Sequence, residues 1–183
     1  MAQDWHDDVL AFWFDEMDAA QWFNGSEELD NLTRSRFAKM LDELSHNPPK
    51  TVYSDPRQAL AAVLLFDQFP RNIYRGTARA FATDDLALRI ARQAVDARFD
   101  DQLSPNERLF LYMPFQHSEV SADQGHSVML FGSLALEEPL RYAIEHRDII
   151  DRFGRFPHRN AVLGRESTAD ELAFLEQHAG YGQ

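Results

Sequence analysis

Helix start signals recur along the whole 183-residue chain, and they constrain its fold more than any other feature. Each signal combines a residue whose side chain can accept a hydrogen bond from a free backbone amide with acidic residues or proline in the first helical turn. Three of them also fit the reciprocal capping box. The simple signals lie at Ser26, Asp55-Pro56 and Thr83, and the capping boxes begin at Ser104, Ser121 and Thr168.

Between these signals, apolar residues recur at helical spacing. The first helix is expected from about Asp4 to Asp15, the helix after Ser26 stops at Asn47-Pro48-Pro49, and another runs from about Pro139 to Phe153 before Gly154. Residues 59–66 read ALAAVLLF, which is apolar on every side and predicts a central buried helix.

Strand signals are weak, because no stretch alternates cleanly with β-branched residues and no Asn-Gly or Asp-Gly hairpin turn occurs. Connections between the predicted helices are short, so neighbouring helices should pack antiparallel. The sequence therefore predicts an all-α fold, a compact array of eight to nine antiparallel helices that forms a single domain over residues 1–183.

Composition narrows the function classes. The chain has no cysteine, which excludes disulfides, thiolate metal sites and cysteine nucleophiles. A net charge of −12 argues against nucleic-acid and anionic-membrane partners. The N-terminal residues lack a basic stretch and a long apolar run, so we expect a cytoplasmic protein. Arginines nevertheless gather in two windows without any acid, residues 68–83 and residues 152–165.

The first arginine window follows the predicted buried helix. Asp67 closes its apolar stripe and should not be left unpaired, and Arg71 lies four residues later, in the favourable order for an ion pair. Pro70 is expected to kink or end the helix and to turn Arg71, Asn72 and Arg75 into a loop. The motif, which includes Gln68, is either a buried clasp between Asp67 and Arg71 or a ligand-binding segment.

A second polar motif, Met113-Pro-Phe-Gln-His-Ser-Glu119, lies near an expected helix break at Pro114. We expect a hydrogen-bonded pair of His117 and Glu119, either structural or acid–base, with Gln124 nearby. The His-x-Glu spacing matches no strong metal motif, so neither a metal nor a cofactor is predicted. Ser118 is adjacent to His117 in sequence, but adjacency alone does not make a catalytic triad.

The third motif covers residues 152–165, where Pro157 begins a short helix. Its first backbone amides, together with arginines and an imidazole, could form an anion cradle. Alternatively, the arginines cap helix ends and pair with surplus acids. The residues concerned are Arg155, His158, Arg159, Asn160 and Arg165.

Four segments together resemble an uncharacterised bacterial family called domain of unknown function 924, and the resemblance spans essentially the whole chain. It implies an all-α fold similar to tetratricopeptide-repeat arrays, and it implies no established activity. The segments are Val9-Leu-Ala-Phe-Trp-Phe14, residues 67–76, residues 112–119 and residues 152–160.

The leading hypothesis is a pocket for a small carboxylate or phosphate ligand, built where the three motifs meet. If catalysis occurs, His117 with Glu119, or His158, would act as acid or base in a hydrolase or lyase, and the arginines would stabilise negative charge. One alternative is a helical scaffold that binds a protein or peptide partner. Another is an internal polar network that only fixes the fold.

Overall fold

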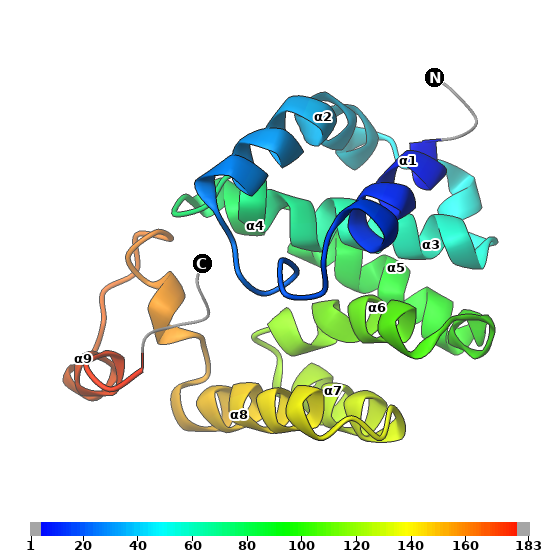
Figure 1. Cartoon of the computed structure of the whole chain (residues 1–183). Coiled ribbons are helices and arrows are strands. Elements are labelled where there is room, and N and C mark those ends of the chain that lie inside the picture. Colours follow the sequence, from blue (N-terminus) through cyan, green and yellow to red (C-terminus); the bar gives the residue numbers. More distant parts are fainter. Residues whose placement is uncertain (1–4, 179–183) are drawn as a thin grey trace.

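The computed structural model describes residues 5–178, and these residues form helices and connecting turns without a strand (Figure 1). The all-α prediction is therefore confirmed. The α-helices are α1 (Trp5–Ala11), α2 (Glu27–His46), α3 (Pro56–Val63), α4 (Phe69–Ile73), α5 (Asp84–Asp96), α6 (Pro105–His117), α7 (Ser121–Ser133), α8 (Glu137–Phe153) and α9 (Ala169–Leu175). Two π-helical segments, η1 (Phe12–Glu16) and η3 (Leu64–Gln68), and four 3₁₀ segments, η2 (Lys50–Tyr53), η4 (Ala78–Phe81), η5 (Phe99–Gln102) and η6 (Pro157–Arg159), complete the set.

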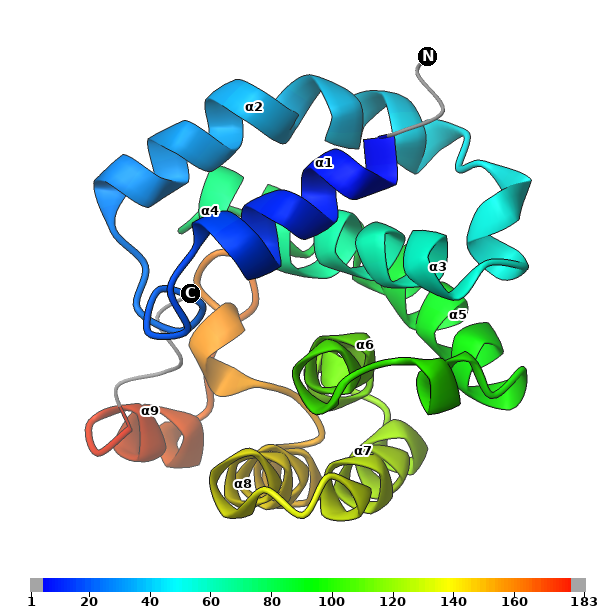
Figure 2. The same ribbon diagram turned by 45° about the vertical axis from the view of Figure 1, so that its right-hand side comes forward.

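The helices are stacked in sequence order. Helices α1 and α2 lie at one end, α3 to α5 in the middle and α6 to α8 at the other end, as Figures 1 and 2 show. Short connections make α6, α7 and α8 run in alternating directions. The resemblance to tetratricopeptide-repeat arrays stays a prediction. Across residues 5–178, each helix is too short or too polar to cross a lipid bilayer.

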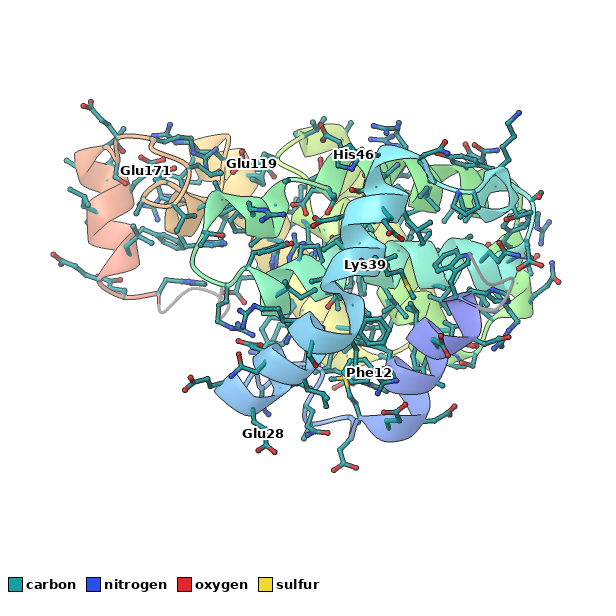
Figure 3. All side chains as sticks on the ribbon, turned by 90° about the horizontal axis from the view of Figure 1, so that it is seen from above. Phe12, Glu28, Lys39, His46, Glu119 and Glu171 are labelled. Atoms are coloured by element: carbon teal, nitrogen blue, oxygen red, sulfur yellow. The ribbon has the colours of Figure 1, made fainter. Side chains whose placement is uncertain are left out.

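The continuous helical path through α3 and η3 is the centre of the core. Every side chain from Ala59 to Phe66 is fully buried, which confirms the predicted buried helix. Aromatic rings from α1, η1 and α2 pack against its continuation, for example Phe37 with Phe69 at 4.7 Å between ring centroids. Phe12, labelled in Figure 3, lies in this aromatic layer beneath α2.

Pro70 does not end the helix, so the prediction of a loop at Arg71 and Asn72 was wrong. The chain stays helical to Ile73 because η3 shifts the backbone pairing just before the proline. Pro70 has no amide to donate to the carbonyl of Phe66, and the hydroxyl of Thr83 donates to that carbonyl instead, at 2.6 Å. Arg71 and Asn72 are consequently buried on α4, and only Arg75 lies in the following turn.

The predicted helix caps are mostly confirmed. Ser26 and Asp55 accept hydrogen bonds from the backbone amides three residues later, and Ser104 and Thr168 form complete capping boxes. The prediction for Ser121 was wrong, because that residue is already helical and its hydroxyl donates to Asp151. Helix α8 begins at Glu137, slightly before the predicted start, and ends at Gly154 in the left-handed conformation. Asp4, the predicted start of the first helix, lies outside the described residues.

The alternating directions of the helices determine where the polar motifs lie. Helices α4, α6 and α8 all end on the side of the molecule where α5 begins, and the segment with η6 passes along that side (Figure 1). The end of each of these helices carries one of the three motifs. This arrangement brings together residues that are far apart in the sequence.

Candidate functional site

Asp67 is the buried centre of the group where the three motifs meet. Its side chain has no exposed surface, and its carboxylate accepts hydrogen bonds from Nδ1 of His117, at 2.8 and 3.0 Å, and from Gln68. Arg71 lies 3.4 Å away on the next turn. Burial alone would raise the pKa of Asp67, but the charge of Arg71 and the contact with His117 outweigh it and hold the pKa at about 2.

His117 lies in the last turn of α6, and one of its two ring nitrogens, Nδ1, is hydrogen-bonded to Asp67. Burial and the nearby charge of Arg71 lower its pKa, and the attraction of Asp67 offsets this only in part. The ring is therefore neutral at pH 7, with the proton on Nδ1 donated to Asp67. Its Nε2 makes no hydrogen bond with any residue in the range 5–178, while 7% of the side chain is exposed. The predicted pairing of His117 with Glu119 was wrong.

Asp84, in the first turn of α5, joins the first and third motifs. Its two carboxylate oxygens accept from the guanidinium of Arg71 at 2.9 and 3.0 Å, and Nη1 of Arg159 lies 3.6 Å from one of them. Asp84 follows the helix start signal at Thr83 and is not among the residues predicted for the site. We call Asp67, Arg71, Asp84, His117 and Arg159 the polar cluster.

Arg159 is the most constrained arginine of the third motif. It is 5% exposed, and its guanidinium carbon lies 4.6 Å from the ring centres of both Phe81 and Phe156. Nη1 donates to the carbonyl of His117 at 3.1 Å. Burial and the charge of Arg71 lower the pKa of Arg159 to about 10. Among the described residues, neither Nε, which is fully buried, nor Nη2 has a hydrogen-bond partner.

Two more imidazoles lie beside the polar cluster. The ring centres of His146 and His158 are each 5.5 Å from that of Phe156, and His146 is 6.4 Å from His117. Burial lowers the pKa of His158 to about 3 and lowers that of His146 well below its ordinary value. All three rings are therefore uncharged near neutral pH.

Glu119 does not bind His117 and instead binds residues of the third motif. Its carboxylate accepts two hydrogen bonds from Arg165, at 2.7 and 3.0 Å, and one from the backbone amide of Phe156, at 2.7 Å. Burial would raise the pKa of Glu119, but these donors lower it. Glu119 is therefore an ionised anchor that holds the segment around η6 against the end of α6.

The third motif does not form the predicted cradle of backbone amides. The amide of Arg159 donates to the carbonyl of Phe156 at 3.1 Å, and the amide of Asn160 donates to that of Pro157 at 3.0 Å. Asn160 also donates through its side chain to Ser167 at 3.0 Å. The third motif therefore contributes side chains rather than free amides to the polar cluster.

Three other predicted site residues bind carboxylates outside the polar cluster. Arg75 and Asn72 bind the carboxylate of Asp30 on α2, at 2.7 Å and 2.9 Å. Arg155 forms a two-point ion pair with Glu171 on α9, at 2.6 and 2.8 Å. Glu119 and Glu171 lie apart from each other in Figure 3. Carboxylates outside the polar cluster thus bind these residues, and for Arg155 this matches the alternative interpretation of the third motif.

Gln124 supports the end of α6 and is fully buried. Its side-chain amide donates to the carbonyls of Gln116 and Ser118, at 2.8 and 2.6 Å, and more weakly to that of Phe115, at 3.4 Å. The last turn of a helix leaves such carbonyls without backbone donors. Gln124 therefore fixes the turn that carries His117 and makes no hydrogen bond to the polar cluster itself.

The sequence profile of a family described as "Bacterial protein of unknown function (DUF924)" matches residues 9–179. The chain belongs to the DUF924 family. A solved structure of a protein of unknown function from Agrobacterium tumefaciens is similar to it at 38% identity, with a TM-score of 0.89, over 94% of this chain and 97% of that one. A comparison with curated proteins gives no match.

The DUF924 chain also has two surface hollows away from the polar cluster. One, of about 420 Å³, lies between the end of α8 and the start of α9 and is lined by Arg152, Arg155 and Glu171 among others. The second, of about 430 Å³, lies between α2, α4 and α5. Neither hollow is lined by Asp67, His117 or Arg159. A ligand at the polar cluster would thus contact the narrow exposed part of His117 and Arg159.

Proposed function

We propose that this DUF924 protein binds a small carboxylate or phosphate at the polar cluster, with His117 as its proton acceptor and Arg159 as its anion-binding group. The observation that carries the proposal is the hydrogen bond from Nδ1 of His117 to the buried carboxylate of Asp67. It fixes the tautomer and leaves the basic Nε2 without a partner among the described residues.

The charges around the imidazole support an acid–base role. Arg71 keeps Asp67 ionised, and Asp67 in turn stabilises the imidazolium that forms when Nε2 takes a proton. Two carboxylates and two guanidiniums leave the polar cluster without net charge while His117 is neutral. Protonation by an acidic ligand would give the cluster one positive charge, which the bound anion would balance.

The reaction class that fits is proton abstraction from water or from a substrate, as in a hydrolase or lyase. The hydroxyl of Ser118 donates to Asp123 at 2.6 Å, and Asp123 also binds Arg92, so Ser118 is engaged elsewhere. His117 would therefore act directly on the substrate or through water. Arg159 would stabilise the negative charge that develops.

Thermal unfolding with added inorganic phosphate, acetate or citrate tests the binding step. A ligand at about 100 times its Kd stabilises a protein by about 2.7 kcal/mol, which corresponds to a rise in Tm of about 5–10 °C for a chain of this size. We expect His117→Gln and Arg159→Lys to reduce this rise. The control Arg155→Gln, which alters an arginine outside the polar cluster, should retain it.

Imidazole nitrogen NMR supplies the second measurement, because it reports on His117 directly. The proposal expects an anion that stabilises the protein to shift the Nε2 resonance of His117 and to raise the pKa of that ring. Unchanged Tm and unchanged His117 resonances with every anion would instead identify the polar cluster as a purely structural network.

A further inference from the structure

The second hollow, which we call the α2–α5 hollow, has a composition that suits an organic anion. Its volume of about 430 Å³ is within the range of small-molecule sites. It lies beside His46 at the end of α2, and Figure 3 shows that residue far from Glu171, which lines the other hollow. Its lining includes Leu41, Asp42, Tyr74, Arg79, Leu86 and Arg89.

The lining of the α2–α5 hollow includes a cationic group, the guanidinium of Arg79. The guanidinium of Arg79 lies 4.0 Å from the ring centre of Tyr74 and donates to the Tyr74 hydroxyl at 3.0 Å. It also donates to Asp42 at 3.1 Å. These contacts pair Asp42, the carboxylate in the lining, with the positive charge of Arg79.

Arg89, on α5, supplies a second positive charge that no protein group balances locally. Its side chain makes no hydrogen bond, ion pair or ring contact with any residue in the described range 5–178. Every other arginine in that range makes at least one such contact. Arg89 is exposed at the α2–α5 hollow, so its charge is accessible to a ligand.

Between the two arginines, the hollow has an apolar floor. Leu41 and Leu86 are 3% and 8% exposed, and buried Pro70 lies between the helices that carry them. Counting Asp42 against Arg79 and Arg89 leaves one positive charge above this floor. A monovalent anion with an apolar body would complement both this positive charge and the apolar floor.

We propose that the α2–α5 hollow binds a small carboxylate with an apolar, preferably aromatic, body. Arg89 would bind the carboxylate, since its planar guanidinium suits two-point contact with that group. The body would lie over Leu41 and Leu86. This site is separate from the polar cluster, because none of the five cluster residues lines it.

An NMR titration with sodium benzoate at constant ionic strength tests the proposal. We expect benzoate to shift the backbone amides of residues 41–46 and 82–89. Because a hydrogen bond to a charged group contributes about as much as a tenfold change in affinity or more, Arg89→Gln should weaken binding at least about tenfold. Arg98→Gln serves as the matched control, because Arg98 is exposed and pairs only with its neighbour Asp101.

Two further ligands separate the charge from the apolar body. Benzyl alcohol lacks the charge and acetate lacks the ring, so each should bind at least about tenfold more weakly than benzoate. Equal binding of benzoate to wild type and Arg89→Gln would overturn the proposal, as would equal binding of benzyl alcohol. Benzoate shifts confined to the polar cluster would overturn it too. His117→Gln should leave benzoate binding unchanged, which keeps this test independent of the proposed function.

Discussion

The substitution Asp67→Asn tests whether the buried carboxylate stabilises this fold. It removes the negative charge but keeps the size of a side chain that has no exposed surface. Asp84, which Arg71 shares with Arg159, would then be the remaining acidic partner of Arg71. Breaking a buried ion pair by removing one charge is strongly destabilising, because the remaining charge stays buried.

The pKa of Asp67 gives the magnitude. It falls from an ordinary value of 3.8 to about 2, and a change of one in pKa corresponds to about 1.4 kcal/mol. The ionised carboxylate therefore contributes about 2–3 kcal/mol to the free energy of unfolding at neutral pH. A carboxyl whose pKa is lower in the folded state stabilises the fold above its unfolded pKa. This contribution is lost as the pH falls from about 4 towards 2.

Urea unfolding followed by tryptophan fluorescence measures this difference, since Trp13 is buried in the core. At pH 7 we expect Asp67→Asn to unfold with a free energy about 2–3 kcal/mol lower than wild type, and the gap should narrow between pH 4 and pH 3. Asp101→Asn is the control, because an exposed ion pair contributes about 1 kcal/mol or less. An Asp67→Asn protein as stable as wild type at pH 7 would refute the reasoning.

Two further predictions concern hydrogen bonds that complete the helices. Thr83→Val should lower the free energy of unfolding by about 1–2 kcal/mol, since it leaves the Phe66 carbonyl without its donor. Thr83→Ser keeps the hydroxyl, so in urea unfolding it should retain most of the wild-type stability. Gln124→Met should lower the free energy of unfolding by about 2–3 kcal/mol, because it removes donors to the carbonyls at the end of α6. The control Gln93→Met changes an exposed glutamine and should lower this free energy far less in the same urea experiment.

Local sequence signals predicted the helices well, because capping and apolar periodicity act over a few residues. Ser26, Asp55, Ser104 and Thr168 needed only their immediate neighbours. The effect of Pro70 was predicted wrongly because it depends on Thr83, which immediately precedes α5 and supplies the missing donor. The expectation that proline ends a helix uses only local sequence, whereas the hydrogen bond that keeps this helix intact comes from tertiary structure.

The polar cluster could be predicted only in part. The sequence identified Asp67 and Arg71 because a charge that closes an apolar stripe needs a partner. It identified His117 from an expected helix break and Arg159 from an arginine-rich motif. It could not show that His117 would bind Asp67 on η3 rather than its neighbour Glu119, because that choice depends on where α6 ends against η3. Asp84 was missed because its role at a helix start already explained it.

Asp84 is shared by Arg71, which precedes it by 13 residues, and by Arg159, which follows much later in the chain. During synthesis on the ribosome, Arg71 and Asp84 therefore emerge together, while Arg159 emerges only after helices α5 to α8. The early helices can pair most of their charges before the chain is complete. The packing of Arg159 between the rings of Phe81 and Phe156 is therefore a late step in folding.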